Sequence, residues 1–126
     1  MMETLSPNFF VHDIRATISW YEALGFELTM RVPETGDTAW AMMTCGSVTV
    51  MFQTFASLGD TLPDVSRNPG GSLLLYVKLK GIRSFFERVK GSVTILQGLE
   101  KTFYGATEFS VKDINGYILT FAEDEG

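Results

Sequence analysis

Residues 11–28 read VHDIRATISWYEALGFEL, and this stretch decides the fold. Asp13 offers a carboxylate immediately before a helical pattern, where an N-cap residue belongs. Gly25 closes the pattern, in the place where a left-handed residue ends a helix. Between them, apolar residues recur at the spacing of one helix face: Ile14, Ile18, Tyr21 and Leu24. The stretch therefore predicts a strand, a helix and a second strand in succession.

Alternating apolar residues and turn signals extend this pattern through the first half of the chain. Strands are predicted over residues 5–11, 26–30, 38–45 and 48–54, and Gly46-Ser47 forms the tight turn between the last two. The first half is thus predicted to fold as strand, helix and three strands, the order βαβββ.

The second half repeats this order. A helix is predicted over 81–90, ended by Gly91, and strands over 72–79, 93–97, 106–112 and 117–123, with a loop over 98–104. Residues 113–116, DING, predict a hairpin turn, because Asn-Gly tolerates positive φ at both positions. One constant offset pairs Val11 with Val77 and Gly25 with Gly91.

These elements predict an α+β fold of two βαβββ modules, at about residues 5–54 and 72–123, within a single domain over 1–126. Residues 55–71 lack a sustained period and contain two prolines and a Gly-Gly pair, so we expect a long surface connection. Each module has one helix to cover one face of its sheet, and the other face is expected to stay open.

The composition excludes several classes of protein. With 126 residues, 45% of them apolar, the chain suits one ordinary domain. A net charge of −5 argues against nucleic-acid binding, which needs a basic face. No apolar run reaches the roughly 18–20 residues that span a membrane, and the first ten residues do not resemble a secretory signal. We therefore expect a cytoplasmic protein.

Two residue types occur once each. The single cysteine, Cys45, excludes a disulfide within the chain, fits a reducing compartment and is expected to be a buried, inert thiol. The single histidine, His12, is expected to be a partly exposed residue at a turn. One chain therefore cannot build a metal site of two or three histidines.

Two motifs carry a resemblance to a known family. Residues 11–26 contain Val-His-Asp-Ile, then Ser-Trp-Tyr, then Leu-Gly-Phe, and residues 104–121 contain Tyr-Gly, then EFSVKDINGYILTF. These stretches resemble the opening and closing patterns of the vicinal oxygen chelate superfamily, which includes glyoxalase I, extradiol dioxygenases and metal-free bleomycin-binding proteins. Ile114 stands where the family usually has proline.

The resemblance implies that the two modules form a U-shaped, cup-like mixed sheet with the helices on its outer face. It also implies four cup-facing ligand positions in the metal-dependent members, which fall here on Ser6, Met51, Ser72 and Thr120. Hydroxyl and thioether groups are poor ligands for divalent transition ions. A shift of two residues along each strand gives Asn8, Gln53, Leu74 and Ala122, which supply no carboxylate or imidazole. We therefore expect no metal and no cofactor.

Strand parity identifies the side chains expected to line the cup. Trp40 and Met42 share one face of their strand, as do Met51 and Gln53 on the next, and Ser72, Leu74 and Tyr76 on a later one. Phe103 and Tyr104 are expected to cap the pocket. The predicted ligand-binding residues are Asn8, Trp40, Met42, Met51, Gln53, Ser72, Leu74, Phe103, Tyr104, Glu108 and Thr120. The alternative is that these residues only fill a core or a dimer interface.

Among the carboxylates, Glu108 is the one candidate for a catalytic group. It shares a strand face with Ser110, so on a cup-facing strand it would act as a general base or a hydrogen-bond anchor. The alternative is an exposed strand carboxylate. Glu123, at the end of the last strand, is expected to be a charge in solvent.

Three functions follow from these patterns. The first is metal-independent binding of a small amphipathic or aromatic molecule, as in bleomycin-resistance proteins. The second is a glyoxalase- or dioxygenase-type enzyme with displaced metal ligands, and the third is an interaction module that binds no ligand. Because open sheets leave edges and apolar faces bare, we also expect a homodimer, with each cup built within one chain or across the interface.

Overall fold

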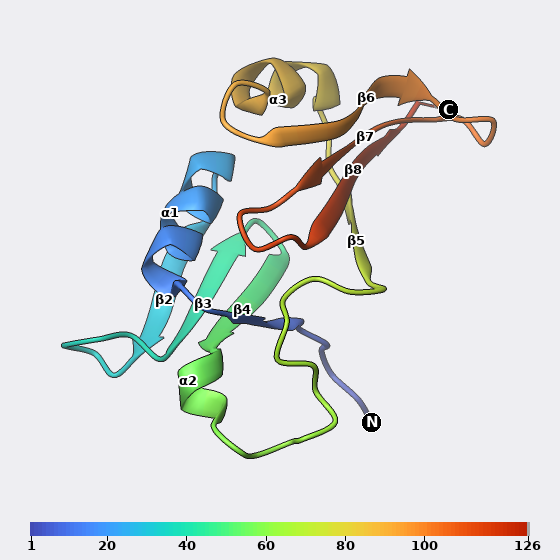
Figure 1. Ribbon diagram of the computed structural model, residues 1–126. Coiled ribbons are helices and arrows are strands. Elements are labelled where there is room, and N and C mark those ends of the chain that lie inside the picture. The colour runs from blue at the N-terminus through green and yellow to red at the C-terminus, as the bar shows by residue number, and fades with distance from the viewer. Residues whose placement is uncertain (126) are drawn as a thin grey trace. The chain divides into compact units, whose positions relative to one another are not determined.

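The computed structural model describes residues 1–125 and divides the chain into two compact units (Figure 1). The first unit is Met1–Pro69, and the second begins at Gly70. We call them the first and second modules. The structure defines each module by itself, and the cup that the resemblance implies stays a prediction.

The first module contains a four-stranded mixed sheet in the order β1-β4-β3-β2. Strands β1 and β4 are parallel, and the other neighbours are antiparallel. Its elements are β1 (Asn8–Val11), α1 (Ile14–Leu24), β2 (Glu27–Val32), β3 (Trp40–Cys45), β4 (Val48–Thr54) and the short helix α2 (Phe55–Leu58).

The second module repeats this topology with the strand order β5-β8-β7-β6. Its elements are β5 (Leu74–Lys78), α3 (Ile82–Val89), β6 (Thr94–Lys101), β7 (Ala106–Lys112) and β8 (Ile118–Asp124). Strands β5 and β8 are parallel, as β1 and β4 are in the first module. The predicted α+β class and the two βαβββ modules are therefore confirmed.

In each module the helix packs on one face of the sheet around a central phenylalanine. Phe52 is fully buried, and its ring lies 4.7 Å from that of Tyr21 in α1. Phe109 is also fully buried, and its ring lies 5.0 Å from that of Phe86 in α3. Because side chains alternate along a strand, the residues between these buried positions point to the opposite, open face.

Helix α1 has the bounds that its sequence predicts. The Asp13 side chain accepts a hydrogen bond from the amide of Ala16, and Gly25 adopts the left-handed conformation at φ 111°. Both end signals lie within or beside the helix itself, which is why local sequence is sufficient to define it.

Helix α3 is shorter than predicted and begins differently. Gly81, the residue before it, provides no side-chain cap, and Lys90 follows it in a right-handed conformation, one residue before Gly91. The carboxylate of Glu123 accepts hydrogen bonds from the amides of Gly81 and Ile82 at 3.0–3.1 Å. The prediction of a solvent charge at Glu123 is therefore wrong, because this half-buried carboxylate caps a helix from another strand.

Strands β1 and β5 begin later than predicted, and this removes Ser6 and Ser72 from the sheets. Strand β1 starts at Asn8, after Pro7, which has no amide hydrogen to donate. Strand β5 starts at Leu74, which pairs with Ile118, the first residue of β8. Residues before Leu74 find no strand partner, because the residues before Ile118 still belong to the turn that precedes β8.

Strand β6 is longer than predicted. It continues into the range predicted as a loop, 98–104, and ends at Lys101. Its pairing with β7 shifts register on both sides of Gln97. Gly98 lies within the second shift. These irregularities break the two-residue period from which strands are recognised, so the prediction ended too early.

The 113–116 hairpin turn forms, but by other means than predicted. Only Gly116 has positive φ, at 94°. The buried Asp113 side chain accepts hydrogen bonds from the amides of Asn115 and Tyr117, both at 2.8 Å. An aspartate that binds its own following backbone is a common turn former, and it leaves Asn115 in an ordinary conformation.

The connection between the modules is more ordered than its composition suggests. It begins with α2, and the guanidinium of Arg67 then donates hydrogen bonds to four backbone carbonyls, those of Gly59, Thr61, Leu62 and Val65, at 2.6–3.1 Å. Arg67 thus replaces the hydrogen bonds that a helix or sheet would otherwise supply to this segment.

Cys45 and His12, the single cysteine and the single histidine, are both exposed. Cys45 is exposed, so the prediction of a buried thiol is wrong: it ends β3 beside the Gly46-Ser47 turn. His12 is exposed as expected, and its ring lies 4.6 Å from that of Phe55. Among residues 1–125, no helix is long and apolar enough to cross a membrane.

Candidate ligand-binding surfaces

The open face of the first module brings together all five residues predicted for it. Register places Asn8, Met51 and Met42 in one row across β1, β4 and β3, and Phe10, Gln53 and Trp40 in the next. All six are half-buried. The face is therefore a mainly apolar surface, and Phe10, which the prediction omitted, belongs to it by its parity with Asn8.

Two amides form the polar part of this face. The Asn8 Nδ2 group donates a hydrogen bond to Gln53 Oε1 at 3.1 Å. The Asn8 Oδ1 atom is buried and accepts no hydrogen bond from any residue in 1–125. A buried acceptor without a donor is uncommon in native proteins, so the pair retains hydrogen-bonding capacity.

The open face of the second module is more polar and more exposed. Register aligns Tyr76 with Thr120 and Ser110, and the hydroxyls of Ser110 and Thr120 lie 2.8 Å apart. Leu74 precedes Tyr76 on the same face, and each is about half exposed, at 50% and 45%. Ser72, predicted to line this face, lies before β5 and outside the sheet.

Glu108 lies at the centre of this second face. The Tyr76 hydroxyl donates a hydrogen bond to Glu108 Oε2 at 2.5 Å, and the Tyr104 hydroxyl donates to the same oxygen. These bonds stabilise the protonated phenols, so hydrogen bonding to Glu108 raises the pKa of both Tyr76 and Tyr104 above the ordinary 10.0. The sequence placed Tyr76 and Glu108 on this face but did not predict their contact.

The loop before β7 contributes two aromatic rings. Phe103 is 99% exposed, and its ring packs edge to face on Tyr104 at 5.1 Å. Tyr104 thus lies beside Glu108, and Phe103 packs on the outside of Tyr104.

The four positions that the resemblance assigns to metal ligands do not fit a divalent ion. Met51 and Thr120 lie on open faces, whereas Ser6 and Ser72 lie outside the strands. The Thr120 hydroxyl is already bonded to Ser110. A thioether and hydroxyls are weak ligands for such ions, and residues 1–125 hold no group of three or more His, Cys, Asp or Glu side chains placed to bind one.

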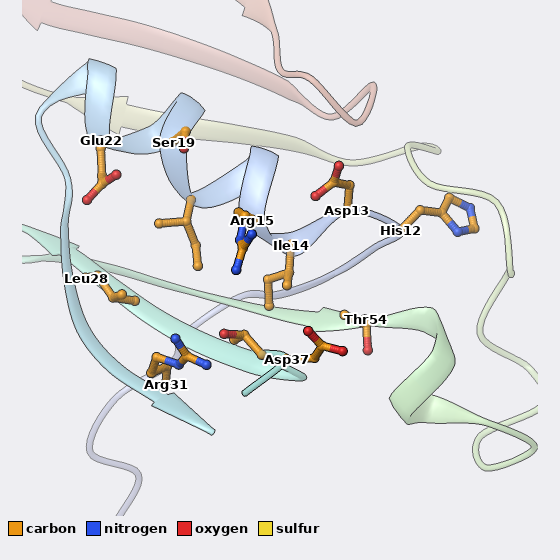
Figure 2. A pocket seen from close by; sticks show the side chains of 12 residues that line it. His12, Asp13, Ile14, Arg15, Ser19, Glu22, Leu28, Arg31, Asp37 and Thr54 are labelled. Atoms are coloured by element: carbon orange, nitrogen blue, oxygen red, sulfur yellow. The ribbon is translucent and has the colours of Figure 1, made fainter. Parts of the chain in front are cut away.

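A separate groove of about 620 Å³ lies on the helix side of the first module (Figure 2). It runs between α1 and β2, and Figure 2 shows charged side chains along it, among them Asp13, Arg15, Glu22, Arg31 and Asp37. The sequence did not predict this groove, because its walls come from the helix and from the edge of the sheet rather than from a strand face.

Two of the charged groups in this groove already have structural roles. The Asp13 carboxylate caps α1. The Arg31 guanidinium donates to the carbonyl oxygen of Pro33 at 3.0 Å and to that of Gly36, and so holds the turn after β2. The groove is thus lined largely by charged groups, whereas the open face of the first module is mainly apolar with a few polar anchors, the usual composition of a small-molecule site. The open faces are therefore the better candidates for ligand binding.

Several solved structures share the fold of this chain. TioX from Micromonospora sp. ML1 matches with a TM-score of 0.78 and 20% identity, covering 98% of this chain and 99% of that one. A bleomycin resistance determinant encoded on the transposon Tn5 matches with a TM-score of 0.71 and 21% identity, covering 99% and 100%. A bleomycin-binding protein complexed with bleomycin matches with a TM-score of 0.69 and 21% identity, covering 98% and 100%.

The family comparison is more specific than these structural matches. No curated protein sequence matches the chain significantly. The family model of the Glyoxalase/Bleomycin resistance protein/Dioxygenase superfamily matches residues 5–121. This range covers most of both modules and all of the two motifs quoted above. Nearly the whole chain fits this model, and the protein accordingly belongs to that superfamily.

Proposed function

We propose that this protein binds a small amphipathic or aromatic molecule on its open sheet faces and needs no metal ion to do so. The observation that carries the proposal is the open face of the first module, where Trp40, Met42 and Met51 surround the Asn8–Gln53 amide pair. An apolar surface with a few polar anchors is the usual composition of a small-molecule site.

The second module supports the same proposal with different groups. Tyr76, Tyr104 and Leu74 offer exposed apolar area beside Glu108 and Thr120. In this proposal Glu108 anchors the ligand by a hydrogen bond and does not act as a base. Phe103 would cover the ligand from the neighbouring loop, since its side chain is 99% exposed without one.

Metal independence is proposed from the chemistry of the donor atoms. The positions that the resemblance assigns to metal ligands carry Ser6, Met51, Ser72 and Thr120, which attract divalent ions weakly. The relative whose structure is described as a complex with bleomycin is a binding protein, and sequestration of a ligand would likewise be sufficient activity for this chain.

A thermal-shift screen with aromatic and amphipathic compounds, including bleomycin, tests this function. In buffer containing EDTA, some compound is expected to raise the Tm in a concentration-dependent way, because a ligand that binds only the folded state stabilises it. The Trp40→Ala variant should lose most of this stabilisation, and the exposed turn variant Ser47→Ala should keep it.

Two other results would contradict the proposal. Stabilisation that appears only after Ni, Zn, Fe or Mn is added would favour a metal-dependent enzyme with displaced ligands. A complete lack of stabilising compounds would favour an interaction module that binds no small molecule.

We also propose that the protein forms a C₂ homodimer in the cytoplasm. Large apolar side chains are about half exposed on three edge strands: Met30 and Val32 on β2, Leu74 on β5 and Leu96 on β6. An exposed apolar edge favours pairing with another chain, and the single free thiol of Cys45 suits a reducing compartment. Light scattering at micromolar concentration should give the mass of a dimer, and a monomer mass would overturn this assignment.

A further inference from the structure

Glu108 on the open face of the second module is a negative charge with no cation of its own. Both phenols, from Tyr76 and Tyr104, donate to Oε2. Within residues 1–125, Oε1 accepts no hydrogen bond and Glu108 forms no salt bridge. One carboxylate oxygen is thus held in place by tyrosines while the other keeps its capacity to accept.

The charges around Glu108 increase this deficit of positive charge. Glu100 on β6 lies directly opposite Glu108 in the ladder with β7, and like charges in that arrangement repel one another. Lys78 is the nearest basic residue on the same face by register, but its ammonium pairs with Asp124 at 3.0 Å. Lys112 lies four residues along β7, roughly 13 Å away at the usual strand rise.

The two tyrosine rings add a second means of attracting a cation. Tyr76 and Tyr104 are 45% and 57% exposed, so their rings remain accessible while their hydroxyls hold Glu108. A cationic group beside an aromatic face is stabilised by the ring quadrupole. Hydrogen bonds that fix the carboxylate before binding also reduce the entropy lost when a ligand arrives.

The remainder of this face suits an apolar group. Leu74 is half exposed and lies two residues from Tyr76 on β5. The side chains of Ser110 and Thr120 are uncharged, and their hydroxyls are hydrogen-bonded to each other. A ligand with an ammonium group at Glu108 would therefore place its hydrocarbon part on Leu74 and Tyr76.

We propose that Glu108, with Tyr76 and Tyr104, binds a primary ammonium group, so that the ligands of this protein are aromatic or amphipathic amines. The inference rests on the proposed function and adds to it the chemical class of ligand. The ammonium donates N–H hydrogen bonds to Glu108 Oε1 and lies against the two rings, and binding involves no covalent step.

A matched pair of probes tests the inference: 2-phenylethylamine, which is an ammonium ion at pH 7, and neutral 2-phenylethanol. Amide NMR titration should give a dissociation constant for the amine about tenfold smaller than for the alcohol, as expected for one charge-assisted contact. The largest shifts should occur at Tyr76, Tyr104 and Glu108. In the Glu108→Gln variant this preference for the amine should disappear while the alcohol binds as before.

The control variant Glu34→Gln makes the same change in charge at an exposed residue of the first module, and it should retain the tenfold preference. An equal loss in Glu34→Gln would show that only the net negative charge attracts the amine and would overturn the inference. Equal binding of both probes to the wild type would also overturn it and leave the proposed function intact. If neither probe shifts any amide at millimolar concentration, the inference fails, and the thermal-shift screen decides the proposed function separately.

Discussion

The two modules share one backbone plan but differ in what their open faces offer. The first presents half-buried apolar side chains around a neutral amide pair, Asn8 and Gln53. The second presents exposed tyrosines around a carboxylate, Glu108. The buried faces, in contrast, are built alike, with a phenylalanine at the centre of each. The repeat is therefore maintained by the core, and the open faces are where the modules differ in chemistry.

The largest expected effect tests whether the two cores are equivalent. Phe52→Ala in the first module and Phe109→Ala in the second should each lower the free energy of unfolding by about 3–5 kcal/mol, the usual cost of such a cavity. Urea denaturation measures both. Phe103→Ala removes the same ring at a position 99% exposed and should change stability by less than about 0.5 kcal/mol.

A core variant that costs less than about 1 kcal/mol in one module only would contradict this equivalence. It would mean that one of the two phenylalanines packs loosely and that the repeat of the buried faces is not shared.

A smaller effect concerns how the two helices begin. Asp13 caps α1 from the adjacent position, whereas Glu123 caps α3 from 41 residues further along the chain. Hydrogen bonds from the amides of Ile82 and Gly81 hold the pKa of Glu123 below its ordinary 4.5. A lowered pKa in the folded state stabilises the protein above the ordinary pKa, and this contribution is lost as pH falls through the lowered value.

The variant Glu123→Gln should therefore be less stable than the wild type at pH 7, and the difference should shrink as the pH falls below 4.5. Chemical denaturation at a series of pH values measures it. A difference in stability that stays constant down to pH 2 would show that the charge on Glu123 does not contribute.

The smallest expected effect is local to the second open face. In Glu108→Gln, the pKa values of Tyr76 and Tyr104 should return toward 10.0, because the carboxylate that stabilises their protonated hydroxyls is gone. Carbon NMR of labelled tyrosine rings follows each titration. Unchanged pKa values at Tyr76 and Tyr104 would contradict the hydrogen bonds to Glu108.

The parts of the fold that the sequence predicts correctly are those with local signals. The cap and the terminal glycine of helix α1 lie next to it in the sequence. In strands β4 and β7, inward- and outward-facing side chains alternate without interruption. The extension of β6 beyond Gln97 was predicted as a loop because its bulges break the two-residue period. The hydrogen bonds of Arg67, which order the connection, leave no pattern in the sequence.

For the candidate site, too, only features within a single strand could be predicted from the sequence. Parity was sufficient to place Trp40, Met42, Met51 and Gln53 on one face. The contact of Tyr76 with Glu108 could not be predicted, because it crosses β8 and depends on the strand order β5-β8-β7. Residues 32 positions apart become neighbours only when that order is known.

The proposed function is the binding of a small molecule on the open sheet faces without a metal ion. Its most direct test is amide NMR mapping, in buffer containing EDTA, of the compound that stabilises the protein most in the thermal-shift screen. The shifted amides are expected to belong to open-face residues such as Trp40, Gln53, Tyr76 and Glu108. Shifts confined to the groove between α1 and β2, or shifts that appear only after a divalent metal is added, would contradict it.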